Sequence, residues 1–194
     1  MRSAVVASLR DDKGITIVEF AIVAPCLVLL MIGLLDLGFK AYVGIQLQGA
    51  LEQSARQVTV GTSTTTAALT SLVKTQIVKI VPKASVSVVP TSYYDFANVG
   101  KPEPITTDTA PLGTFNQGDC FQDLNGNGVW DADAGSSGTG GSEDIVYYTA
   151  TVTYPDLLPA AKLFGFSSTA TVTGTTMMKN QPYASQAEPA IKCT

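Results

Sequence analysis

Residues 15–35 form an almost unbroken apolar run, in which only Thr16 and Glu19 are polar. A helix of this length rises about 30 Å, which matches the thickness of the hydrocarbon core of a bilayer. The pattern therefore predicts a transmembrane helix over residues 15–35. Pro25 lies inside the run and should kink this helix, a distortion that membrane helices tolerate.

Three other kinds of segment also place an apolar run near the start of a chain. A secretory signal peptide has a shorter apolar region and then a small-residue cleavage site, which residues 36–40 do not provide. A lipoprotein signal would use Cys26 as its acylated residue, but Pro25 precedes it and further apolar residues follow it. A buried helix of a soluble protein is the remaining alternative, although apolar runs of about 18 residues or more normally span a membrane.

Beyond the run, apolar residues recur at three- and four-residue steps among polar ones, which is typical of one helix face. The recurring positions are Val43, Leu47, Ala50, Leu51, Ala55 and Val58. We therefore expect an amphipathic continuation of the helix over residues 36–61, ending near Gly61. A second amphipathic helix should follow the capping residues 62–66 and stop at Pro82.

Alternating patterns predict strands farther along the chain. Residues 84–89 alternate Ser with Val, and residues 145–154 place apolar and polar side chains on opposite faces. The Thr-rich residues 168–178 should form a strand antiparallel to residues 145–154.

The remaining segments carry weaker patterns. Residues 90–118 should be irregular with short strands at most, residues 157–164 should form a short helix, and residues 179–194 form a polar tail. The predicted fold class is α+β: a long N-terminal transmembrane helix with its amphipathic extension, a second helix, and a small antiparallel β-sheet within residues 62–194.

Glu19 is a carboxylate near the front of the apolar run, where an uncompensated charge is costly. A protease that cut after Gly14 would create a cationic amine on Ile15. Glu19 of one subunit would then pair with the Ile15 amine of its neighbour, and the pair would fix the axial stagger of packed helices. The alternative is a carboxylate that reaches out to the lipid headgroups.

These residues carry a family resemblance. Lys13-Gly14, four residues, Glu19-Phe20 and a long apolar run resemble the processing motif of type IV prepilins. Ile17–Pro25 and Leu35–Gly38 are similar to the membrane segment of TadE-like pseudopilins, from the Flp/Tad (tight adherence) branch. Further segments resemble the periplasmic part of that family: Phe121–Asp131, Tyr148–Thr149 and Asn180–Tyr183.

The resemblance implies a leader over residues 1–14 that prepilin peptidase removes between Gly14 and Ile15, and a role for Glu19 and Phe20 in assembly. It implies a single-pass protein of the inner membrane with a periplasmic C-terminal domain. Other pilins and the proteins of the assembly platform would be its partners. Flp major pilins are far shorter than this chain, so the resemblance favours an accessory subunit, a minor pilin or pseudopilin.

The charge of the leader supports this orientation only in part. Arg2, Arg10 and Lys13 before the span favour a cytoplasmic N-terminus, while Asp11 and Asp12 dilute the basic stretch.

The composition narrows the function classes. The formal net charge is −4, and no basic patch is visible, which argues against nucleic-acid binding. The chain has no histidine, the commonest acid–base group and metal ligand. The glycine-rich run Gly135–Gly141 lacks the lysine of a phosphate-binding loop. We therefore expect a structural protein and no enzyme.

The three cysteines differ in setting. Cys26 lies in the apolar run, where it should act as a small hydrophobic residue. Cys120 and Cys193 lie in the exported part and form a disulfide candidate in an oxidising compartment, the alternative being two free thiols.

An acidic segment over residues 119–144 contains a candidate calcium loop. Oxygen ligands fall at positions one, three, five and nine, Gly128 at position six allows a sharp turn, and position seven would supply a backbone carbonyl. The bidentate glutamate of position twelve is missing, and Asp133, Glu143 or Asp144 would replace it. The predicted ligands are Asp123, Asn125, Asn127, Val129, Asp131 and Asp133. The alternative is an Asn-Gly turn with solvated acids.

Two function hypotheses therefore stand. The first is a minor pilin or pseudopilin that acts in pilus assembly and adherence. The second is a calcium-dependent adhesion or binding module on a plain single-pass anchor, which would keep its leader.

Overall fold

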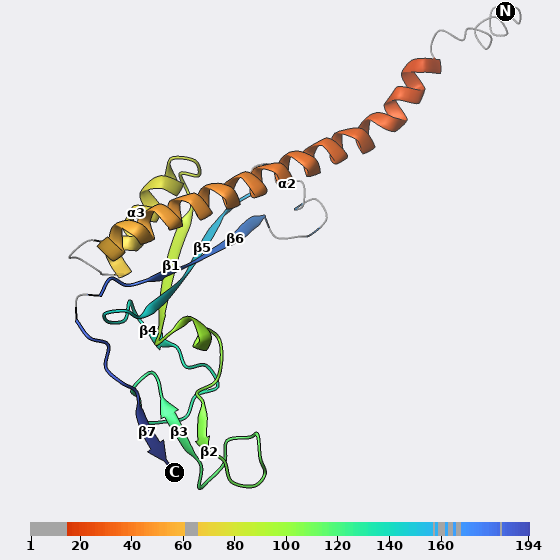
Figure 1. The fold of residues 1–194 in the computed structure, drawn as a ribbon. Helices are drawn as coiled ribbons and strands as arrows, with labels where there is room; N and C mark the ends of the chain where they lie inside the picture. The colour runs from red at the N-terminus through yellow and green to blue at the C-terminus, as the bar shows by residue number, and fades with distance from the viewer. Residues whose placement is uncertain are drawn as a thin grey trace, which may run out of the picture. The chain divides into compact units, whose positions relative to one another are not determined.

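The computed structural model describes residues 15–60, 66–156, 158, 162, 165, 168–182 and 184–194. It divides into two units, Met1–Ala41 with Asp156–Ser168 and Tyr42–Pro155 with Thr169–Thr194, which we describe separately. The described chain contains a long apolar helix, a second helix and antiparallel sheets, so the predicted α+β class is confirmed (Figure 1).

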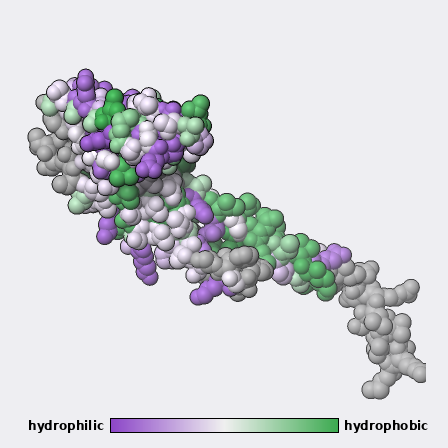
Figure 2. All heavy atoms as spheres, turned by 90° about the horizontal axis from the view of Figure 1, so that it is seen from below, coloured by the Kyte–Doolittle hydropathy of each residue, from purple (hydrophilic) through white to green (hydrophobic). Residues whose placement is uncertain are grey.

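Helix α2 spans Ile15–Val60, so the predicted membrane helix and its continuation form one element of 46 residues. Pro25 lies inside α2 and does not end it. In the first unit, most large apolar side chains of α2 from Ile17 to Leu37 are 40–74% exposed, while Ile32 and Phe39 are half-buried. Figure 2 shows this hydrophobic surface along the helix. The predicted leader, residues 1–14, lies outside the described residues.

In the second unit, α2 turns one face to a core. Val43, Leu47, Ala50, Leu51 and Ala55 are at most 3% exposed. Their three- and four-residue steps place them on one side of the helix. The predicted spacing therefore corresponds to a buried face.

Helix α3 spans Thr66–Val78 and buries Leu69, Val73 and Ile77. Gln76 on α3 donates from Nε2 to Oε1 of Gln53 on α2 at 3.3 Å. The capping residues expected at 62–65 lie outside the described residues.

A four-stranded antiparallel sheet has the order β4-β1-β5-β6. Its strands are β1 (Ser85–Tyr93), β4 (Ser136–Ser137), β5 (Ile145–Pro155) and β6 (Thr169–Lys179). The alternation predicted for β5 is confirmed, since Val146, Tyr148, Ala150, Val152 and Tyr154 are all buried. Helix α2 lies against β6, where Nε2 of Gln48 donates to the carbonyl of Thr175 at 2.9 Å.

The predicted end of the first strand at residue 89 is wrong, because β1 runs through Pro90 to Tyr93. Proline lacks an N–H, so it fits a strand only where no ladder bond is needed. The carbonyl of Pro90 accepts from the N–H of Gly138, which places the backbone polar groups of Pro90 on the β4 side. There β4 pairs only with Thr91 and Ser92, so the missing N–H leaves the ladder between β1 and β5 intact.

A second, three-stranded sheet has the order β2-β3-β7. It contains β2 (Ile105–Thr107), β3 (Cys120–Asp123) and β7 (Ala190–Cys193), and the 3-10 helix η2 (Phe96–Asn98) precedes it in the chain. The sequence predicted only a polar tail where β7 lies. All four residues of β7 are exposed, so no hydrophobic alternation marks this strand. The short helix expected at 157–164 falls almost wholly outside the described residues.

Candidate functional site

The start of α2 carries the residues assigned to processing and assembly. Ile15 is the first helical residue, while Gly14 lies outside the described residues. Glu19 is exposed, and Phe20 is 67% exposed. From residue 16 to residue 39 the helix contains no Lys or Arg. A cation that pairs with Glu19 therefore has to come from outside this stretch of α2.

Helix α2 is long and apolar enough to cross a membrane, over Thr16–Gln57, and no residue of its most apolar window is buried. Exposed apolar area costs about 25 cal/mol per Å² in water, and contiguous patches of this kind mark contacts with protein or lipid. The helix fits a single-pass membrane anchor.

The predicted calcium loop is held in shape by its own side chains. Asp123 Oδ2 accepts from the N–H of Gly128 at 2.9 Å. Asn125 Oδ1 accepts from the N–H of Asn127 at 3.0 Å, and Asn127 Oδ1 accepts from the N–H of Val129 at 2.7 Å. Gly128 has a φ of 78°, which favours glycine and makes the sharp turn expected at position six.

Two asparagines of the loop converge on one aspartate. Asn125 Nδ2 and Asn127 Nδ2 both donate to Oδ2 of Asp131, at 2.8 and 2.6 Å. In the part of the chain that the structure describes, no group of three Asp, Glu, His or Cys side chains could hold a metal ion by itself. The structure thus joins Asn125 and Asn127 directly to Asp131, while Asp123 contacts the same turn through the N–H of Gly128.

Asp133, a further predicted ligand, is directed away from the loop. Its Oδ1 accepts from the N–H of Gly135 at 3.1 Å, and its Oδ2 accepts from the Tyr93 hydroxyl at 3.3 Å. Burial and this carboxylate together raise the pKa of Tyr93.

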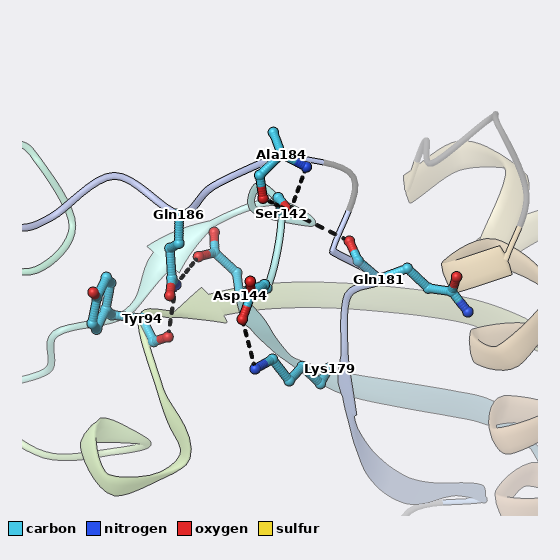
Figure 3. A network of polar contacts seen from close by, with 8 residues as sticks. Tyr94, Ser142, Asp144, Lys179, Gln181, Ala184 and Gln186 are labelled. Atoms are coloured by element: carbon cyan, nitrogen blue, oxygen red, sulfur yellow. Dashed lines mark hydrogen bonds and ion pairs between the residues drawn. The ribbon is translucent and has the colours of Figure 1, made fainter.

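The two other acids considered for position twelve also have partners elsewhere, and Figure 3 shows one of them, Asp144, beside Gln186. Glu143 forms an ion pair with Lys179 at 3.1 Å. Asp144 accepts from the N–H of Gly141 at 2.6 Å and from Nε2 of Gln186 at 2.7 Å. These contacts tie residues 141–144 to the C-terminal segment and leave neither acid to complete the loop.

Sequence reasoning missed Glu103, which is 1% exposed. Its Oε1 accepts from the N–H of Leu124 at 2.8 Å, and its Oε2 accepts from the N–H of Asp131 at 3.1 Å. Its carbonyl accepts from Nε1 of Trp130 at 2.9 Å. Glu103 therefore joins both ends of the loop, and no local pattern predicts this, because the contacts span 21 to 28 residues.

The predicted disulfide is confirmed between Cys120 and Cys193, with an S–S distance of 2.05 Å. The two cysteines are directly paired residues of β3 and β7. Cys26 is free and exposed on α2. The bond fixes the end of the chain beside the strand that leads into the acidic loop.

Comparison with known proteins finds a similarity for the N-terminal segment of the chain. Residues 14–56 match the family model described as TadE-like protein. Over this segment, the chain is similar to TadE-like proteins. Neither the curated proteins nor the solved structures contain a significant match.

The TadE-like match covers the start of α2, including Gly14, Glu19 and Phe20, and less than a quarter of the chain. The later segments that resemble the family, at 121–131, 148–149 and 180–183, lie beyond it. The family comparison therefore concerns α2 alone, and the second unit has to be understood from its own contacts.

Asp119 organises the segment before the disulfide. It is fully buried, and its Oδ1 accepts from the N–H and the hydroxyl of Thr109, both at 2.7 Å. Its Oδ2 accepts from the N–H of Asn116 at 2.8 Å. The Thr109 N–H above all, then the Thr109 hydroxyl and the Asn116 N–H, lower the pKa of Asp119 against the opposing effect of burial.

Asp119→Asn should reduce the sensitivity of the fold to acid. A carboxyl with a lowered folded pKa stabilises the fold fully above its ordinary value of 3.8, and this stabilisation is lost as the pH falls through the folded pKa. The melting temperature of wild type should thus fall more between pH 7 and about pH 3 than that of the variant does. The exposed Glu188→Gln serves as the control; equal acid sensitivity of Asp119→Asn and wild type would contradict the assignment.

Proposed function

We propose that this chain is a minor pilin or pseudopilin of a Flp/Tad type IV pilus, anchored in the inner membrane by α2 with its C-terminal domain in the periplasm. The observation that carries the proposal is the TadE-like match, which begins at Gly14, the residue before the expected cut. The exposed apolar surface of α2 supports it, because such a helix needs lipid or other helices around it. The role is structural, with no catalytic step.

Assembly would use the start of α2 in three steps. Prepilin peptidase cuts between Gly14 and Ile15 and releases residues 1–14. The new Ile15 amine pairs with Glu19 of a neighbouring subunit, so both charges are compensated as the helices pack. The exposed Phe20 and the apolar residues after it then exchange lipid for the helices of other pilins at the assembly platform.

Processing is the direct test. N-terminal sequencing of the chain from cells with prepilin peptidase should give Ile15 as the first residue, and deletion of the peptidase should restore the leader. A Gly14→Leu variant, which changes only the residue before the cut, should keep its leader in both strains. An intact leader on the wild-type chain in peptidase-containing cells would contradict the proposal.

The second candidate function is a calcium-dependent adhesion or binding module on a single-pass anchor. The acidic loop, joined at both ends by Glu103 and adjacent to the disulfide, favours it. This candidate requires an unprocessed N-terminus and a binding activity that a chelator abolishes. Leader removal therefore separates the two functions in one measurement.

A further inference from the structure

Asp123 is 4% exposed, and its Oδ1 has no hydrogen-bond partner among the described residues. Its other oxygen accepts from Gly128 across the turn, so the carboxylate faces the inside of the loop. A buried carboxylate oxygen without a partner is costly, because its hydration is lost and nothing replaces it. A cation at this oxygen would remove the cost.

The loop supplies further oxygens around the same carboxylate. Asn125 Oδ1 and Asn127 Oδ1 each accept one backbone N–H, and an amide oxygen has a second lone pair for a cation. The Asp131 carboxylate accepts two side-chain amide N–H groups. The amide N–H groups of Asn125 and Asn127 carry partial positive charge, and they lie at the Asp131 carboxylate, where a bound divalent cation would also lie.

Lys192 lines the same pocket as Asp123, but no Lys or Arg forms an ion pair with a carboxylate of the loop among the described residues. Residues 119–144 contain no Lys or Arg. The ion pair between Lys179 and Glu143 lies outside the loop. Asp123 and Asn125 line a pocket of about 550 Å³, which gives an ion a route to the loop from solvent.

We propose that the loop from Asp123 to Asp131 binds one calcium ion. The ligands are the side-chain oxygens of Asp123, Asn125, Asn127 and Asp131 with the backbone carbonyl of Val129. An all-oxygen set on a flexible loop suits calcium better than magnesium, which demands near-ideal octahedral geometry. With two carboxylates only, the dissociation constant should fall at about 10⁻⁴–10⁻³ M, the range of extracellular modules.

Glu103 is a positioning residue in this site. Both of its carboxylate oxygens accept backbone N–H groups, at Leu124 and Asp131. It thereby holds the first and last ligands of the loop at a fixed separation. This structural role replaces the absent glutamate of position twelve without adding a ligand.

Trp130 provides a direct probe, because it is the single tryptophan of the chain and lies inside the loop sequence. Terbium should be titrated into the full-length protein in detergent, with excitation of Trp130. We expect saturable terbium emission that calcium reverses and that magnesium at equal concentration reverses far less. Asp123→Asn should weaken terbium binding tenfold or more, and the matched control Asp133→Asn should change it less than twofold.

Calcium should also raise the melting temperature of the wild-type protein, an effect that Asp123→Asn loses. Should Asp123→Asn fail to fold, as judged by circular dichroism in calcium-free buffer, Asp131→Asn takes its place. The proposal is overturned if wild type shows no saturable emission and no thermal shift up to about 10 mM calcium. Equal weakening by Asp123→Asn and Asp133→Asn also overturns it, since that result describes diffuse attraction to an acidic surface.

Discussion

Glu19→Val should leave the chain in the membrane and remove it from assembled pili. Glu19 is a charged residue in an exposed apolar stretch that contains no Lys or Arg. Valine removes the cost of placing this charge in the hydrocarbon of the bilayer, so the helix should still insert. In assembly the same change leaves the Ile15 amine of the neighbour unpaired. A hydrogen bond to a charged group contributes about 1.5–3 kcal/mol, which corresponds to roughly a tenfold to hundredfold loss of incorporation.

The measurement has two parts, membrane fractionation of the variant and its amount in sheared pili. Thr16→Val is the matched control, because it replaces the other polar residue of the run without removing a charge. The control should assemble normally. If Glu19→Val enters pili as well as wild type does, the pairing with Ile15 is wrong even where cleavage after Gly14 is correct.

Local periodicity explains which parts of the fold were predictable. The helical steps from Val43 to Ala55 and the alternation along β5 each describe one element with one buried face, and each face is buried as expected. Such patterns involve only residues close in sequence, so a single chain is enough to recognise them.

The missed parts depend on partners far away in the chain. Pro90 stays in β1 only because its missing N–H faces the short strand β4. Strand β7 has no buried face and exists by pairing with β3, about 70 residues earlier. Neither the position of Pro90 in β1 nor the formation of β7 can therefore be predicted from amino-acid composition or from strand propensity.

The candidate site also has one part that local residue spacing predicts and another part that depends on residues from other segments. The spacing from Asp123 to Asp131 predicted a turn, and the structure closes that turn with the bond from Gly128 to Asp123 and the bond from Asn125 to Asp131. The position of Asp133 and the role of Glu103 were not predictable, because Tyr93 and the loop N–H groups that bind them come from other segments. Residue spacing thus predicts ligands within one turn better than it predicts the groups that support them.

Removal of the disulfide should be the most destabilising change in the second unit. The bond closes a loop with a sequence separation of 73 residues. The chain-entropy relation gives about 4 kcal/mol for a loop of this length. In a chain of this size, that loss lowers the melting temperature by about 10 °C. The double variant Cys120→Ser/Cys193→Ser should show this shift in detergent, while Cys26→Ser, which changes the free cysteine of α2, should not.

The same variant should release β7 before the rest of the domain unfolds. All four β7 side chains are exposed, so without the bond the strand keeps only its backbone pairing with β3 and the contacts of Thr194 near Asp119. Hydrogen exchange of residues 190–194 should therefore accelerate far more than exchange in β5. A double variant with a wild-type melting temperature and protected β7 amides would show that the β3–β7 pairing holds the terminus by itself. The calcium loop, which begins at the end of β3, would then owe its position to Glu103 and not to the disulfide.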